Sequence, residues 1–322
     1  MTQVKKPGKV YIIGAGPGDP GLITLKAVQA LAGADVVIYD NLVNEELLKY
    51  APANARFTYA GKQGGDHTLS QDQINALLEQ EARAGHTVAR LKGGDPFIFG
   101  RGGEELQVLA ANGIPFEVIP GVTSAIAAPA YAGIPLTHRR MASTVAFVTG
   151  HEDPTKEQSD INWPALAGIG TLVFLMGVKN LSQITAALLE AGKAPETPAA
   201  LIRRGTTPHQ QTLSGTLVDI ATKATEHGFR PPAILVVGQV VDLRQTLGWF
   251  ENLPLFGRGV LITRPERQAD DLARLLADKG ANPIPFPTIA IEPPGSWQEL
   301  DAAINRLEDY GWLIFTSANG VH

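Results

Sequence analysis

Short apolar runs alternate, in the first half of the chain, with stretches that repeat apolar positions every three or four residues. The repeating stretches predict amphipathic helices at Leu22–Leu31, Gln71–Ala84 and Gly103–Asn112, each followed closely by a glycine. Strands and helices that alternate in this way predict an α/β fold built on a largely parallel sheet. The strands are expected at Val10–Ile13, Asp35–Tyr39, Thr87–Leu91, Phe116–Ile119 and Thr144–Val148.

The pattern changes from Asn162 onward, where strands are short and turn residues such as Arg230–Pro231–Pro232 follow one another closely. Such spacing is typical of a mixed or antiparallel sheet. We therefore predict two α/β lobes, residues 8–135 and residues 136–250, with a ligand cleft between them. The elements expected in the second lobe are strands Thr171–Met176, Ala199–Ile202, Thr212–Gly215 and Ile234–Val237 and helices Leu181–Ala191 and Leu217–Glu226.

A third unit is predicted at residues 257–322. Few elements are expected in it, and we expect them to bury too little apolar surface for independent stability, as in an incomplete domain. They are strands Val260–Thr263, Asn282–Ile291 and Trp312–Thr316 and helices Gln268–Lys279 and Trp297–Asp309.

Composition narrows the class of protein. With 44% hydrophobic and 18% charged residues the chain can form a full core, and no apolar run approaches the roughly 20 residues of a membrane helix. The lysines near the N-terminus are not followed by the apolar stretch of a secretory signal, so a cytoplasmic location without membrane contact is expected. The absence of cysteine excludes disulfides and thiol nucleophiles. Scattered histidines predict no metal site, and a net charge of −5 argues against nucleic acid as the main partner.

A glycine-rich loop, Gly14–Asp19, follows the first strand directly. A dinucleotide-binding loop requires G-x-G-x-x-G, but the sixth position here is Asp19 and Pro17 stiffens the turn. Asp40 stands roughly where a nicotinamide enzyme places its ribose-binding acid, so an oxidoreductase stays a weak alternative. A tight turn that needs glycine dihedrals is the simplest interpretation.

A second loop, Leu91–Glu105, contains five glycines within eleven residues. Because each glycine loses backbone entropy on folding, a ligand approaching the backbone explains them better than packing alone. With Asp95, Arg101 and the apolar Phe97–Phe99 between them, the loop suits a polar, partly aromatic ligand. A purely structural turn remains the alternative.

Two further segments have both a functional and a structural interpretation. The free N–H groups at Pro120–Ala125, with the Thr123 and Ser124 hydroxyls, suit a ligand carboxylate or ribose. They equally suit a helix N-cap, the commoner use of these residues. His138, Arg139 and Arg140 form a basic run after a turn, and a solvated loop is the alternative there.

Together these segments resemble, in order and spacing, the uroporphyrinogen-III C-methyltransferase family over roughly residues 8–250. From Gly257 onward the chain is instead similar to the start of uroporphyrinogen-III synthase, an enzyme that resembles two lobes around a cleft; we expect no synthase activity because the second lobe is absent. The matching segments are Val10–Asp19, Tyr39–Val43, Gly61–Lys62, Arg90–Glu105, Pro120–Ser124, Tyr131–Arg139, Val148–His151, Leu172–Gly177 and Pro232–Gly238.

The resemblance implies transfer of the methyl group of S-adenosylmethionine to C2 and then C7 of uroporphyrinogen III, giving precorrin-2, by a homodimer. It implies Asp40 as proton acceptor and Lys62 as proton donor. Another precorrin or ribosomal-RNA methyltransferase of the same fold is the alternative. The cofactor pocket that it implies consists of Pro17, Gly93, Gly94, Asp95, Ile98, Thr123, Ser124, Met176 and Gly205.

The expected substrate bears eight carboxylates, so an acidic protein must gather positive charge locally. The candidates are Lys62, Arg101, His138, Arg139 and Arg140. Arg101 is the strongest, because a planar guanidinium between glycines can meet a carboxylate in a two-point fork.

Overall fold

The computed structural model describes residues 7–61, 69–152, 160–290 and 292–316. The chain divides into two compact units, one of residues 1–258 with 277–282 and the other of residues 259–276 with 283–322. Among the described residues, no helix has the length and apolar character needed to cross a bilayer.

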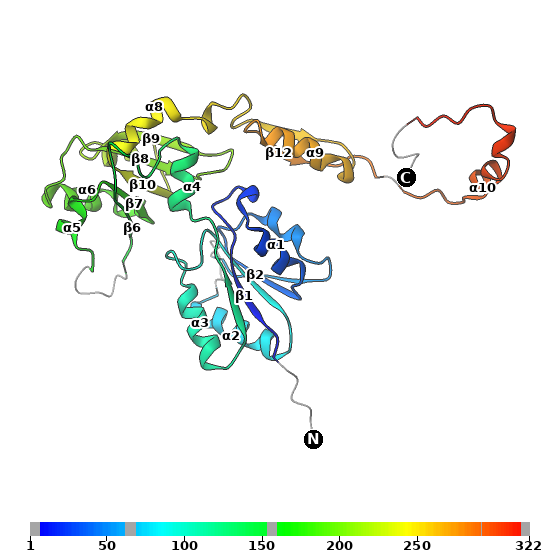
Figure 1. Ribbon diagram of the computed structural model, residues 1–322, viewed down its shortest axis with the longest axis horizontal. Helices are drawn as coiled ribbons and strands as arrows, with labels where there is room; N and C mark the ends of the chain where they lie inside the picture. The colour runs from blue at the N-terminus through cyan, green and yellow to red at the C-terminus, as the bar shows by residue number, and fades with distance from the viewer. Residues whose placement is uncertain (1–6, 62–68, 153–159, 291, 317–322) are drawn as a thin grey trace, which may run out of the picture. The chain divides into compact units, whose positions relative to one another are not determined.

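The first sheet is parallel throughout, as predicted, with strand order β3-β2-β4-β1-β5 (Figure 1). Helices α1 and η2 pack on one face through Leu31 and Leu47, and α2 and α3 pack on the other through Leu78 and Leu109. The elements are β1 Val10–Gly14, α1 Leu25–Ala32, β2 Val36–Tyr39, η2 Glu45–Tyr50, β3 Arg56–Tyr59, α2 Gln71–Arg83, β4 Val88–Lys92, α3 Gly102–Ala111 and β5 Phe116–Ile119.

Two local details of this lobe differ from the prediction. The helix expected from Leu22 begins at Leu25, because the Thr24 side chain accepts the Ala27 N–H and caps it there. Strand β3 was not predicted: Arg56 and Phe57 face solvent at the sheet edge, so no buried apolar run marks it. The other strands of this sheet agree with the prediction to within about one residue.

The second sheet is mixed, as predicted, in the order β6-β7-β10-β8-β9, with only the β6–β7 pair parallel. Helix α4 packs on one face through Ala125 and Ala128, while α6 and α7 pack on the other through Leu188 and Ile220. The elements are α4 Ser124–Tyr131, β6 Val145–Thr149, α5 Trp163–Ala167, β7 Thr171–Leu175, α6 Leu181–Glu190, β8 Pro198–Arg203, β9 Gln211–Thr216, α7 Ile220–Glu226, β10 Ala233–Val237 and α8 Arg244–Leu247, with the short 3-10 helices η3 Val178–Asn180, η4 Gln239–Leu243 and η5 Phe250–Asn252. A further 3-10 helix, η1 Pro20–Leu22, lies between β1 and α1.

The C-terminal region holds a two-stranded sheet and two helices. The strand predicted at Trp312–Thr316 is wrong: these residues have no regular structure, and Trp312 is 86% exposed. Without a neighbouring strand, an apolar run has no partner for its backbone groups. The strand expected over Asn282–Ile291 ends at Pro285. The elements are β11 Gly259–Ile262, α9 Glu266–Ala277, β12 Asn282–Pro285, α10 Gln298–Ile304 and η6 Leu307–Asp309.

Candidate functional site

The strand order places a topological switch between β1 and β4. From β1 the chain passes through α1 to β2 on one side, whereas from β4 it passes through α3 to β5 on the other. Loops that diverge in this way mark where doubly wound sheets bind ligands, beyond the carboxyl ends of the strands. The two loops are joined there by paired hydrogen bonds, from Gly94 N to Gly16 O at 2.7 Å and from Gly16 N to Gly94 O at 3.2 Å.

Three strand ends meet at this point through glycine backbones. A Cβ on Gly14 would lie 2.4 Å from the Gly121 nitrogen, and one on Gly121 would lie 2.4 Å from the Gly94 oxygen. Gly94 differs: its φ is +69°, and a Cβ there would approach nothing closer than 3.8 Å, at Thr123 Cα. The space beside Gly94 is therefore open, and the start of helix α4 borders it.

Two predicted ligand groups have structural partners here. The Asp95 carboxylate accepts the Phe97 N–H at 2.8 Å through Oδ1 and the Gly121 N–H at 3.1 Å through Oδ2. Thr123 caps helix α4 by accepting the Ala125 N–H at 3.3 Å, which is the structural alternative noted for this segment. Both side chains thus shape the loops around the open space, and Ser124 begins the helix.

Positive φ angles coincide with several predicted positions. Such a conformation strains a non-glycine residue and persists only where its surroundings enforce it, as happens at ligand sites. Arg101 and Met176 are predicted site residues, and two others flank the predicted Gly205. The non-glycine residues with φ between 47° and 70° in the described part of the chain are Phe99, Arg101, Met176, Arg204 and Thr206.

The first glycine loop contacts the second lobe through Asp19. Its backbone N–H donates to Thr206 Oγ1 at 3.1 Å, and its Oδ2 accepts from the Tyr131 hydroxyl at 2.5 Å. Burial, and then Asp19, raises the pKa of Tyr131. These bonds bring the loop that contains the half-buried Pro17 to the turn that contains Gly205.

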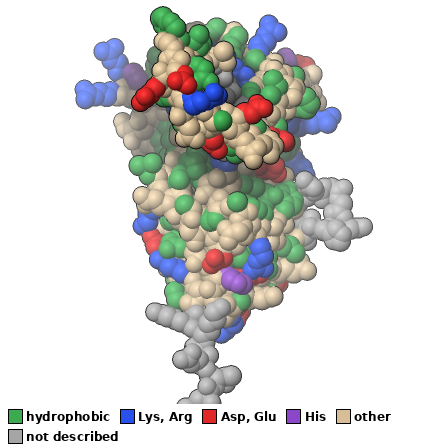
Figure 2. All heavy atoms as spheres, turned by 90° about the vertical axis from the view of Figure 1, so that its right-hand side faces the viewer, with side chains coloured by type: hydrophobic (Ala, Val, Ile, Leu, Met, Phe, Trp, Pro, Cys, Tyr) green, Lys and Arg blue, Asp and Glu red, His purple; other side chains and the backbone are tan. Residues whose placement is uncertain are grey.

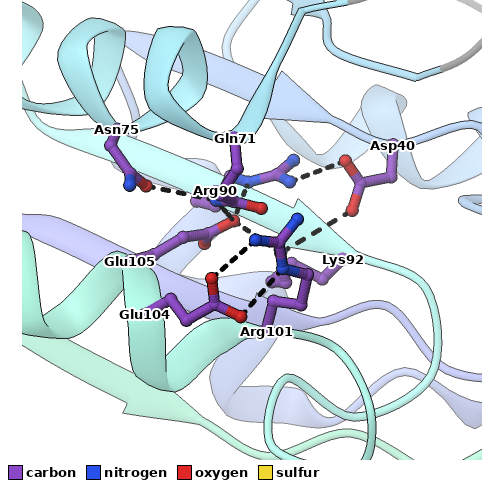
Figure 3. Close-up of polar contacts among 8 residues, drawn as sticks. All are labelled: Asp40, Gln71, Asn75, Arg90, Lys92, Arg101, Glu104 and Glu105. Atoms are coloured by element: carbon purple, nitrogen blue, oxygen red, sulfur yellow. Dashed lines mark hydrogen bonds and ion pairs between the residues drawn. The ribbon is translucent and has the colours of Figure 1, made fainter. Parts of the chain in front are cut away.

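An ion cluster lies beside the second loop (Figure 3). Arg90 and Lys92 on β4 and Glu105 on α3 are almost fully buried, with Arg90 1% and Glu105 0% exposed. Asp40, after β2, meets Arg90 Nη2 at 2.6 Å and Lys92 Nζ at 3.9 Å. Glu105 Oε1 accepts from Lys92 Nζ at 2.6 Å and from Arg90 Nε at 3.2 Å. Two cations and two anions therefore form one connected group.

The cluster changes the chemistry of its members. Burial and the neighbouring Arg90 lower the pKa of Lys92, while Glu105 and Asp40 oppose that shift. Asp40 is its most open member, with 28% of the side chain exposed. Arg90, Lys92 and Glu105 were not predicted as site residues. The signal in the sequence was two cations two positions apart in a buried strand.

Arg101 is engaged by the chain itself. Its Nε and Nη2 donate to the two carboxylate oxygens of Glu104 at 2.8 and 2.6 Å. This contact raises the pKa of Arg101 and lowers the pKa of Glu104. The fork expected for a substrate carboxylate is thus occupied by Glu104, a residue that we did not predict as part of the site.

The other cations predicted to bind the substrate lie on an exposed turn or outside the described residues. Arg139 and Arg140 lie exposed on a turn closed by hydrogen bonds between the backbones of His138 and Ala142, and Lys62 lies outside the described residues. Figure 2 shows basic and acidic side chains interspersed on the face in view. Among the coloured side chains on that face, the basic ones form no broad cluster that would attract an anion.

Large apolar side chains are exposed on the second loop and at Met176, which follows β7. Phe97, Phe99 and Met176 are exposed by 41–57%, unusual for large apolar residues, and Ile98 is half-buried. Among the described residues, no cluster of acidic and histidine side chains suits a metal ion.

Comparison with known proteins gives two matching family models. Residues 9–221 match the tetrapyrrole (corrin/porphyrin) methylases, and residues 270–322 match uroporphyrinogen-III synthase HemD. A uroporphyrinogen-III C-methyltransferase from Bacillus subtilis is 46% identical over 320 residues, 99% of this chain and 65% of that protein. An S-adenosyl-L-methionine-dependent uroporphyrinogen III methyltransferase from Methanosarcina barkeri is 54% identical over 242 residues, 75% of this chain and 95% of that protein.

Among solved structures, the uroporphyrin-III C-methyl transferase of Thermus thermophilus in complex with S-adenyl homocysteine is similar, with a TM-score of 0.63 and 42% identity. The match covers 73% of this chain and 100% of that one. Two relatives that align over nearly the whole chain are longer proteins, of which this chain spans 62% and 65%.

Proposed function

The chain belongs to the tetrapyrrole (corrin/porphyrin) methylase family, and on that premise we propose that it transfers methyl groups from S-adenosylmethionine to C2 and C7 of uroporphyrinogen III, giving precorrin-2. The observation that supports this most directly is the open space beside Gly94 at the switch point of the parallel sheet. The similarity to uroporphyrinogen III methyltransferases from two organisms supports the choice of substrate.

The loops around Gly94 fit the cofactor. A backbone that approaches without a side chain, next to the N–H groups at the start of α4, suits a polar nucleoside or carboxylate. The half-exposed thioether of Met176 offers a polarizable apolar wall. When bound, the cofactor supplies a methyl group already activated on a sulfonium. We propose that Pro17, Gly93, Gly94, Asp95, Ile98, Thr123, Ser124, Met176 and Gly205 hold it.

Proton transfer is proposed for Asp40, with Lys62 as donor. A carboxylate can accept a proton from the methylated ring, and Asp40 is the member of the ion cluster most open to solvent. The pyrrole carbon is itself nucleophilic, so these residues need only align the reactants and move the proton.

Substrate carboxylates are proposed to meet Arg101, His138 and Arg139. For Arg101 this requires that a substrate carboxylate displaces Glu104 or shares the guanidinium with it. Exposed ion pairs contribute little to stability, so replacing Glu104 with a substrate carboxylate costs little free energy.

The test is a methyl-transfer assay with the purified chain, S-adenosylmethionine and freshly prepared uroporphyrinogen III. Mass spectrometry of the oxidised product should show two added methyl groups, and isothermal titration should show binding of S-adenosylhomocysteine. Binding of NAD without binding of the homocysteine, or methylation at other ring positions only, contradicts the proposal.

Two further parts of the proposal concern the whole chain. We propose a homodimer, supported by the family resemblance and tested by light scattering at micromolar concentration. We also propose that residues 257–322 add no synthase activity, supported by the exposure of Trp312 and Ile314 in that region. Conversion of hydroxymethylbilane to the type III isomer above the uncatalysed background would contradict it.

A further inference from the structure

The ion cluster of Asp40, Arg90, Lys92 and Glu105 has a buried end and an open end. At the buried end, Glu105 accepts from both cations through the same oxygen, Oε1. At the open end, Asp40 faces the same two cations, with Arg90 Nη2 at 2.6 Å and Lys92 Nζ at 3.9 Å. The two carboxylates therefore compete for one pair of positive charges (Figure 3).

Stability alone is a poor explanation of this arrangement. Burying charges costs free energy that ion pairing offsets only when every polar atom is satisfied, and apolar residues of similar volume often serve as well. Here Arg90 Nη1 and Glu105 Oε2 are buried without a hydrogen-bond partner among the described residues. Gln71 Nε2 adds one contact, to Glu105 Oε1 at 3.3 Å. The four charged side chains of the cluster thus interact closely with one another, but not all of their polar atoms form hydrogen bonds with described residues.

We infer that Arg90 and Lys92 are positioning residues for the Asp40 carboxylate, and that Glu105, by sharing both cations, sets how tightly Asp40 holds a proton. Glu105 lies against the same two cations and offsets part of the positive potential that Arg90 and Lys92 direct at Asp40. Without it, both cations act on Asp40 alone. The catalytic meaning of this inference rests on the proposed function, in which Asp40 is the proton acceptor.

Other charged groups lie close enough to be counted. At the start of α3, Glu104 and Arg101 neutralise one another, and Lys92 acts on Glu104 across space. Asp72 on α2 and Glu105 both act on Arg101. Glu104, Arg101 and Asp72 are not replaced in the variants below.

The experiment follows the Asp40 carboxyl directly. The full chain is labelled with aspartate carrying carbon-13 at the side-chain carboxyl, and the Asp40 signal is identified by its loss in Asp40→Asn. Glu105→Gln should move the Asp40 titration to lower pH and Lys92→Met should move it to higher pH, each by about one pH unit, since an opposite or like charge at this range shifts a pKa by about that much or more.

A matched control is available in the same lobe. Glu81 is also buried and also forms ion pairs with two basic side chains, Arg56 and His86, so Glu81→Gln removes a comparable charge. It should leave the Asp40 titration unchanged. If Glu105→Gln does not fold, Lys92→Met alone decides the result.

A second measurement connects the cluster to turnover. The acid limb of the pH profile of kcat should move with the Asp40 titration, to lower pH in Glu105→Gln and to higher pH in Lys92→Met. Structural damage would instead lower kcat at every pH. Titrations that do not move, or that move in the same direction in both variants, would overturn the inference. Opposite shifts in the two variants, together with a wild-type chain that fails to methylate uroporphyrinogen III, would support the inference and contradict the proposed function.

Discussion

Arg101 and Glu104 form a two-point fork at the start of helix α3, with Nε donating to Oε1 and Nη2 donating to Oε2. Arg101 holds this geometry from a left-handed backbone conformation, φ 57°. The guanidinium is therefore oriented before any ligand arrives, and a carboxylate of the same chain stands where an external one would bind.

The first prediction concerns substitution of Arg101 and of Glu104, one at a time. Arg101→Ala should weaken binding of the stable analogue uroporphyrin III by about 1.5–3 kcal/mol, the contribution of a hydrogen bond to a charged group. Glu104→Gln should tighten it, because the guanidinium loses its competitor. Titration calorimetry measures both, and S-adenosylhomocysteine affinity should stay constant. An equal loss of cofactor affinity in Arg101→Ala would mean that Arg101 shapes the loop.

The second prediction concerns Gly94. Its φ of +69° and open surroundings are matched by Gly113, whose φ is +65° and whose added Cβ would contact nothing within 4 Å. Alanine at either position should cost about 1 kcal/mol of unfolding free energy, measured by urea denaturation. Only Gly94→Ala should lower S-adenosylhomocysteine affinity, by tenfold or more, because its methyl group occupies the proposed cofactor space. Similar affinities in the two variants would place the cofactor elsewhere.

The third prediction concerns pH and Tyr131. Because burial and Asp19 raise the pKa of Tyr131 above the unfolded value of 10.0, its hydroxyl stabilises the folded state fully below pH 10. That contribution is lost as the pH rises from 10 toward the folded value. Tyr131→Phe should cost about 1 kcal/mol at pH 7, and the gap to the wild type should narrow above pH 10. A gap that stays constant to pH 11 in denaturant titrations would contradict this.

The fourth prediction concerns proteolysis. Residues 292–297 are exposed and have no regular secondary structure, so low concentrations of proteinase K should cut there first, as seen by mass spectrometry. The turn at residues 204–210 is the internal comparison, because it is held by bonds such as Thr206 N to Gln210 Oε1 at 2.9 Å. Earlier cleavage at 204–210 would show that local hydrogen bonding does not protect this chain.

The alternating architecture was predictable because it depends on local periodicity. The buried strands β1 and β4 and the amphipathic helix α2 were all located, since their apolar positions repeat with the period of the element. Strand β3 was not, because at a sheet edge Arg56 and Phe57 face solvent and the pattern disappears. The strand predicted at Trp312–Thr316 is wrong for the opposite reason. The apolar run is present, but no described strand pairs with it.

The candidate site was predictable where it consists of backbone. Gly14 and Gly121 stand where backbones approach closely, and Gly94 stands where φ is positive and the space is open, so all three positions are marked in the sequence by glycine. The sequence does not show which partner a charged side chain will have in the fold. A helix pattern places Glu105 on α3, but only tertiary packing brings it against Lys92 and makes it the least exposed charge of the cluster.

The meeting of Gly14, Gly94 and Gly121 also limits how this pocket can be redesigned. Any side chain at Gly14 or Gly121 would collide with the backbone of a neighbouring strand end, which cannot move aside as a flexible side chain can. Because three strands are joined at one place, a substitution there cannot be accommodated by changing a single neighbour. New ligand specificity is therefore best sought at Phe97, Phe99 and Met176, whose side chains face solvent and can be exchanged one at a time.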